Sequence, residues 1–210
     1  MIQSSGFPTQ YIPLVESAGG LIFDCDGTLV DSMPLHFLAW HQTMLRYGLR
    51  LPEDRFYALG GMPSHRIIEM LAAEQSVEVD AQHAAIEKEQ AFLERLHLLE
   101  PIDSVLEIAR AHRGVKPISV ASGGFRKIIT RQLEIIECLD WFDAIVTAED
   151  TSRHKPEPDV FLEAARRMGV APEKCLVFED ADLGVEAARR AGMPCIDIRS
   201  FYTAKRIPVA

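Results

Sequence analysis

Short apolar runs alternate with longer helical stretches along most of this chain, and no other feature of the sequence constrains the fold as strongly. Each run holds about five mostly apolar residues, which is typical of a strand covered on both faces of a sheet. Strands that alternate with helices of this length form βαβ units, so the sequence predicts a parallel sheet. The expected strands are residues 20–23, 117–121, 143–147, 175–178 and 195–198, and the expected helices are residues 104–112, 126–134, 158–168 and 183–191.

The region of residues 34–99 departs from this alternation, because it carries helical patterns and no convincing strand. The simplest account is an all-helical insertion after the first strand, with Gly60-Gly61-Met62-Pro63 as an internal turn. The predicted fold class is therefore α/β, with a Rossmann-like parallel sheet core and an inserted small all-helical cap domain. The expected cap helices are residues 35–47, 64–74 and 81–98; the cap domain is residues 33–99, and the core is residues 1–32 and 100–210.

Charge and cysteine content narrow the class of protein. The 22 basic and 31 acidic residues give a net charge of −9, which disfavours binding to nucleic acid or to an anionic membrane. The four cysteines are far apart and include no C-x-x-C pair, so we expect buried reduced thiols. Residues 1–18 hold no basic residue and no long apolar run, which predicts neither signal peptide nor membrane anchor. We expect a soluble cytoplasmic protein, as a monomer or homodimer.

Polar side chains follow four of the five expected strands. Asp24 and Asp26 come after the first strand, Ser122-Gly123 after the second, Lys155 beyond the third, and Glu179-Asp180 at the fourth. The carboxyl ends of parallel strands meet at one edge of the sheet, where ligands collect. Carboxylates, a hydroxyl and one ammonium at this edge suit a divalent hard cation that holds a phosphate against a nucleophile.

Roles for these residues follow from the chemistry of phosphoryl transfer, which needs an in-line nucleophile and positive charge at the phosphoryl oxygens. Asp24 is the predicted nucleophile, and Asp26 the acid that protonates the leaving oxygen and then activates water. Ser122, the nearby Gly123 amide and Lys155 are expected to bind the phosphoryl oxygens. The predicted Mg²⁺ ligands are Asp24, the Asp26 carbonyl and Asp180, with Glu179 behind them.

Four motifs of the sequence resemble those of haloacid dehalogenase-type phosphatases. They are D-x-D-G-T-L at residues 24–29, Ser122-Gly123, His-Lys-Pro-x-Pro-Asp at residues 154–159 and Phe-Glu-Asp-Ala-x-x-Gly at residues 178–184. The helical insertion resembles the cap of the β-phosphoglucomutase-like branch. Within that branch, the likeness is to the sugar-phosphate phosphatases that act on fructose 1-phosphate or 6-phosphogluconate. The resemblance implies a Mg²⁺-dependent hydrolase of a small phosphomonoester, in which the cap closes over the substrate.

Two cap residues are further candidates for substrate binding. His36 lies in a segment that resembles β-phosphoglucomutase, in which this histidine approaches the sugar, and Arg66 could reach a second anionic group. A structural histidine and a solvated arginine are the competing interpretations. Turn formation by Asp24 and Asp26, a surface position for Lys155, and helix capping by Asp180 compete in the same way.

Two other functions remain open from the sequence. The first is a sugar-phosphate mutase, although mutases of this branch carry a cap-loop lysine where this chain reads Leu59-Gly60-Gly61-Met62. The second is a non-catalytic binding protein, which would have no need for the complete set Asp24, Asp26, Lys155 and Asp180. The residues favour hydrolysis.

Overall fold

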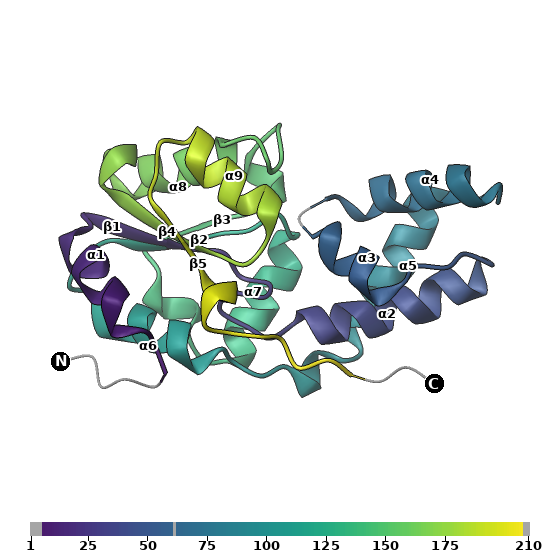
Figure 1. Ribbon diagram of the computed structural model, residues 1–210, viewed down its shortest axis with the longest axis horizontal. Coiled ribbons are helices and arrows are strands. Elements are labelled where there is room, and N and C mark those ends of the chain that lie inside the picture. The colour runs from purple at the N-terminus through teal and green to yellow at the C-terminus, as the bar shows by residue number, and fades with distance from the viewer. Residues whose placement is uncertain (1–5, 61, 208–210) are drawn as a thin grey trace.

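A five-stranded parallel sheet forms the centre of the core, as the sequence predicts (Figure 1). We describe a computed structural model of the chain, which covers residues 6–60 and 62–207. The strand order is β3-β2-β1-β4-β5, and every neighbouring pair is parallel. The strands are β1 (Gly20–Phe23), β2 (Ile118–Ala121), β3 (Ala144–Val146), β4 (Cys175–Glu179) and β5 (Cys195–Asp197).

Helices cover both faces of the sheet, which explains why the strands read as continuous apolar runs (Figure 1). Alternate side chains enter opposite clusters: Leu21 and Phe23 pack on one face with residues of α6 and α7, and Ile22 packs on the other with residues of α8 and α9. The core helices are α1 (Ile12–Ser17), α6 (Asp103–His112), α7 (Arg126–Ile135), α8 (Asp159–Met168) and α9 (Asp182–Arg190).

Glycines end the last two core helices, at the positions where the sequence places helix C-caps. Gly169 has a φ of +67° and Gly192 a φ of +72°, in the left-handed region that costs glycine little. The Gly169 amide donates to the Arg166 carbonyl at 3.2 Å, and the Gly192 amide donates to the Arg189 carbonyl at 3.1 Å. Each helix therefore stops where the chain must turn toward its next segment.

The inserted region is helical and has its own apolar cluster, built around Trp40, Phe56 and Ile68. It contains one helix more than the sequence predicts, because α3 is only six residues long and follows Pro52 too closely to show a periodic pattern. The long helix expected at residues 81–98 ends at Leu93, and a 3-10 turn follows at Leu96–Leu98. The cap helices are α2 (Met33–Arg46), α3 (Glu53–Ala58), α4 (Ser64–Gln75) and α5 (Ala81–Leu93).

The turn in the cap, the cysteines and the lengths of the helices can also be compared with the sequence predictions. In the expected internal turn, the Met62 amide donates to the Leu59 carbonyl at 3.1 Å, while Gly61 lies outside the described residues. All four cysteines are free thiols; three are buried and Cys195 is half-buried. No helix among the described residues is both long and apolar enough to cross a bilayer. We keep residues 33–99 as the proposed limits of the cap domain.

Candidate active site

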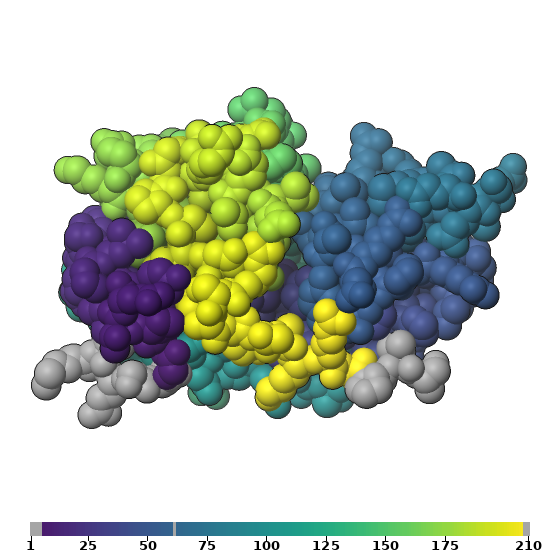
Figure 2. All heavy atoms as spheres, viewed as in Figure 1, coloured from purple at the N-terminus to yellow at the C-terminus, as the bar shows by residue number. Residues whose placement is uncertain are grey.

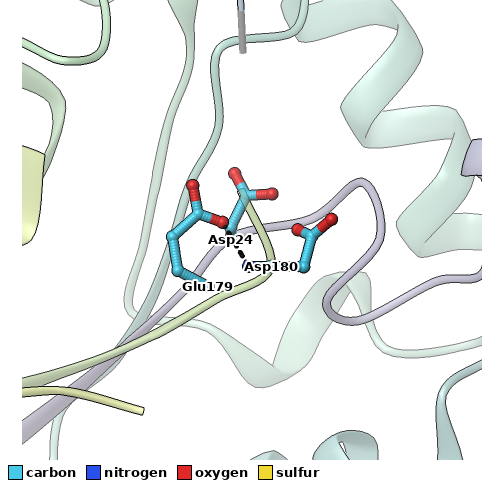
Figure 3. A group of neighbouring side chains, drawn as sticks. All are labelled: Asp24, Glu179 and Asp180. Carbon is cyan, nitrogen blue, oxygen red and sulfur yellow. Dashed lines mark hydrogen bonds between the residues drawn. The ribbon is translucent and has the colours of Figure 1, made fainter. Parts of the chain in front are cut away.

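Three carboxylates meet at the carboxyl edge of the sheet, where the neighbouring strands β1 and β4 end. Asp24 directly follows β1, and its amide donates to the Phe178 carbonyl of β4 at 3.0 Å. Glu179 is the last residue of β4, and Asp180 comes next. Each offers one oxygen atom within 4.8 Å of the others, and the three carboxylates lie on the same side of the strand ends (Figure 3). The sequence correctly places these acidic residues in one group.

A buried lysine supplies positive charge to this group. Lys155 is 7% exposed, and its Nζ donates to Asp24 Oδ1 at 2.7 Å and to Glu179 Oε1 at 2.9 Å. This ammonium therefore pairs with two of the three carboxylates. The surface position that competes as an interpretation of Lys155 is wrong, because the side chain reaches the predicted site.

Burial disfavours the charged forms of Asp24 and Asp180. It raises the pKa of Asp24 to about 8, in spite of the opposing charge of Lys155, and the charge of Glu179 acts in the same direction. Burial, with the charges of Glu179 and Asp24, also raises the pKa of Asp180 well above its ordinary value. A dication among these oxygens would relieve the repulsion, and carboxylate oxygens are the ligands that Mg²⁺ prefers. The donor set therefore fits the predicted ion.

Two motif glycines make room for these carboxylates. Gly27 has a φ of +79°, and a Cβ built there would lie 2.2 Å from Asp180 Oδ2. A Cβ at Gly184 would lie 1.3 Å from Glu179 Oε1. Any larger residue at either position would displace a carboxylate of the group. Steric overlap with a carboxylate therefore explains why these two motif positions, Gly27 and Gly184, are glycine.

Asp26 lies in a different environment, although it is only two residues from Asp24. Its Oδ1 accepts hydrogen bonds from Ser32 Oγ at 2.6 Å, Gln132 Nε2 at 2.8 Å and His36 Nε2 at 3.1 Å. Burial opposes ionisation, but His36, Ser32 and Gln132 outweigh it and hold the pKa of Asp26 well below its usual range. Oδ2 has no hydrogen-bond partner among the described residues.

His36 connects Asp26 to the cap. Its Nδ1 lies 3.0 Å from Nζ of Lys88, which also contacts Glu89 Oε1 at 3.0 Å. The imidazole stacks on Phe92, with ring centroids 3.6 Å apart. Lys88 is 3% exposed, and it is not among the residues predicted from the sequence. Its spacing was a usable signal, because Lys88 lies four residues from both Ala84 and Phe92, on the buried face of α5.

The other predicted residues are Ser122 and Gly123, which follow β2, and Arg66 in the cap. Ser122 lies at the same sheet edge as the carboxylates and is 2% exposed. Its hydroxyl accepts a hydrogen bond from the Gly124 amide at 3.0 Å and donates to no described residue. Gly123 lies beside open space. Arg66 has a side chain that is 66% exposed and pairs with Glu69 at 2.9 Å, so the structure does not bring it to the carboxylates. Its role, like the other assigned roles, stays a prediction.

The fold and this site agree with the family comparison. The model of the family described as haloacid dehalogenase-like hydrolase matches residues 21–198. The chain therefore belongs to the haloacid dehalogenase-like hydrolase family.

Similar proteins and solved structures support membership of this family. Fructose-1-phosphate phosphatase YqaB of Escherichia coli (strain K12) is 38% identical over 188 residues, which are 89% of this chain and 99% of that protein. Beta-phosphoglucomutase of Bacillus subtilis (strain 168) is 29% identical over 188 residues, 85% of this chain and 82% of that protein. A crystal structure of a hydrolase from Pseudomonas syringae has a TM-score of 0.78 at 26% identity, covering 88% of this chain and 87% of that chain.

Proposed function

We propose that this hydrolase is a magnesium-dependent phosphatase of small phosphomonoesters, with a sugar phosphate as substrate. The observation that carries the proposal is the group of Asp24, Glu179 and the half-buried Asp180, for which Lys155 is the one cationic partner among the described residues. The similarity to a fructose-1-phosphate phosphatase supports the substrate class.

In the proposed first step, Asp24 attacks phosphorus and forms an aspartyl-phosphate, while the bond to the leaving oxygen breaks. Asp26 gives a proton to that oxygen through Oδ2, which none of its three hydrogen bonds occupies. The negative charge of the bound phosphate favours the protonated form of Asp26 at this point. In the second step Asp26 takes a proton from water, and that water hydrolyses the intermediate and releases phosphate.

The remaining groups hold charge and position. Lys155 offers a fixed ammonium beside the attacking carboxylate, and the Ser122 hydroxyl and Gly123 amide bind phosphoryl oxygens. Mg²⁺ would be held by Asp24, Asp180 and the Asp26 carbonyl, with Glu179 behind them, and supplies positive charge to the phosphoryl oxygens when bound. His36 acts by orienting Asp26.

A phosphate-release screen over sugar phosphates, with magnesium and with a chelator, tests the proposal. We expect release that depends on magnesium and that the chelator abolishes. Absence of release from every sugar phosphate would contradict the substrate class. Asp180→Ala should lower activity and weaken the magnesium dependence together, and an unchanged magnesium titration would remove Asp180 from the metal site.

A mutase is the second candidate, because beta-phosphoglucomutase of Bacillus subtilis is among the similar proteins. Conversion of β-glucose 1-phosphate to glucose 6-phosphate without release of phosphate would select it. The absence of a lysine in Leu59-Gly60-Gly61-Met62 supports hydrolysis. Cytoplasmic location and assembly as a monomer or homodimer stay predictions of the sequence.

A further inference from the structure

The C-terminal segment of residues 201–207 runs from the core to the cap, and it begins firmly attached to the core (Figure 1). The Phe201 ring packs edge-on against Phe7, with centroids 5.4 Å apart. The Tyr202 amide donates to the Ile198 carbonyl at 2.8 Å. From this point the segment passes the two places where the chain crosses between core and cap.

Lys205 contacts both crossings. Asp31 precedes the first cap helix and Glu100 follows the last, and the Asp31 amide donates to the Glu100 carbonyl at 2.9 Å. The Lys205 amide donates to Asp31 Oδ2 at 3.2 Å, and its ammonium pairs with the Glu100 carboxylate. The segment is therefore bound at the position about which the cap would move.

Arg206 then reaches the cap itself. Its Nη1 donates to Asp54 Oδ1 at 3.0 Å and lies 3.6 Å from Glu53 Oε2. The guanidinium lies 5.3 Å from the centre of the Tyr57 ring. All three partners belong to α3, and Figure 2 shows the C-terminal atoms in yellow against the blue atoms of the cap.

Helix α3 leads from Arg206 to the candidate active site. The helix ends at Ala58, and a Cβ built at Gly60 would lie 3.6 Å from the Cβ of Ala181, the residue after Asp180. A shift of α3 would move the Gly60 turn relative to the acidic group. Arg206 contacts the first turn of this helix and Tyr57, and the turn that follows the helix lies close to Ala181, beside the acidic group.

We propose that Arg206 is a positioning residue, which holds α3 and the Gly60 turn in place against the core so that the cap closes correctly over the substrate. The ion pair is exposed, with side chains 57% and 87% exposed for Arg206 and Asp54. Such pairs change an equilibrium by up to about fivefold, which suits a cap that must also open. The kinetic test of this proposal rests on the proposed function, because it needs a substrate that the protein hydrolyses.

Arg206→Gln, Arg206→Lys and a matched control test the proposal by kinetics. Arg166→Gln is the control, because Arg166 is 71% exposed and pairs with Glu163 within α8, on the core. Loss of Arg206 lowers the fraction of closed protein, so Arg206→Gln should raise KM roughly two- to fivefold with little change in kcat. Arg206→Lys keeps the charge and should restore part of the loss. Equal KM values for wild type and Arg206→Gln would overturn the proposal, as would the same increase in Arg166→Gln.

Amide hydrogen exchange gives a second readout that needs no substrate. Peptides that contain α3 should exchange faster in Arg206→Gln than in wild type, while peptides of α8 should not change. If no sugar phosphate is hydrolysed, the proposed function fails, and this measurement still decides the role of Arg206. Unchanged exchange across α3 would overturn the proposal.

Discussion

Asp24 and Asp26 are separated by a single residue, yet their surroundings act on their charges in opposite directions. Asp24 shares one lysine with Glu179 and lies near Asp180, and its pKa is raised to about 8. Asp26 accepts three hydrogen bonds at one oxygen, and its pKa is lowered. The protein completes the environment of Asp26 with its own donors, whereas Asp24, Glu179 and Asp180 share the single ammonium of Lys155 among the described residues. This difference is why we propose the Asp24 group, and not Asp26 alone, as the site of an external cation.

Asp24→Asn should have the largest effect on activity. An amide cannot form the acyl phosphate, so we expect kcat to fall by at least about a thousandfold. Asp26→Asn removes an acid–base group only and should cost about a hundred- to ten-thousandfold. Phosphate release per active-site equivalent measures both effects, with circular dichroism to check folding. Residual activity of Asp24→Asn within about tenfold of wild type would break the assignment of the nucleophile.

Replacing each of the two buried lysines, Lys155 and Lys88, should lower the free energy of unfolding by different amounts. Lys155→Met removes the ammonium that donates to Asp24 and Glu179 and leaves Glu179 buried without its counter-ion, so unfolding without magnesium should become easier by about 3–5 kcal/mol. Lys88→Met removes a partner of the His36 ring and of Glu89, but the Glu89 side chain is 18% exposed and also accepts from Ser64, so about 1–3 kcal/mol is expected. Urea denaturation at pH 7 measures both. An equal loss for the two variants would show that the groups do not differ in charge balance.

Gly184→Ala should disturb the Asp24 group by steric means alone. The added methyl group overlaps Glu179, which must move away from Lys155 or push the chain aside, at a cost of about 1–3 kcal/mol. Gly123→Ala is the matched control for stability, because no atom lies within 4 Å of a Cβ at Gly123. Thermal unfolding compares the two. If Gly184→Ala were as stable as Gly123→Ala, the close packing of Glu179 on Gly184 would be refuted.

The sequence predicted one half of this comparison better than the other. Asp24, Glu179 and Asp180 adjoin strands that their apolar runs reveal, so sheet topology alone brings them together. The surroundings of Asp26 depend on Ser32 and His36, which lie one helical turn apart, and on Gln132 of α7, which is far away in the sequence. No local sequence pattern predicts that Gln132 donates to Asp26. Gln132 and Lys88 gave a weaker signal, because each is a polar residue on the buried face of a helix.

The smallest expected effect concerns the titration of Asp26. Its pKa lies below the ordinary 3.8, so its carboxylate contributes stability above about pH 4 and loses that contribution as the pH falls through the lowered pKa. His36→Ala removes one donor and should move the pKa upward by about one unit. Carboxyl ¹³C NMR on selectively labelled protein follows this shift. An unchanged Asp26 titration in His36→Ala would mean that the histidine does not stabilise the charged form.

The uncompensated charge of the Asp24 group is tested most directly by magnesium titration calorimetry at pH 7, in two buffers that differ in ionisation enthalpy. Because burial raises the pKa of Asp24 to about 8 and the pKa of Asp180 well above its ordinary value, magnesium binding must displace protons from both carboxyls. We expect measurable proton release on binding at pH 7, and Asp24→Asn should release fewer protons than wild type. Magnesium binding without proton release, or no magnesium binding at all, would contradict the account.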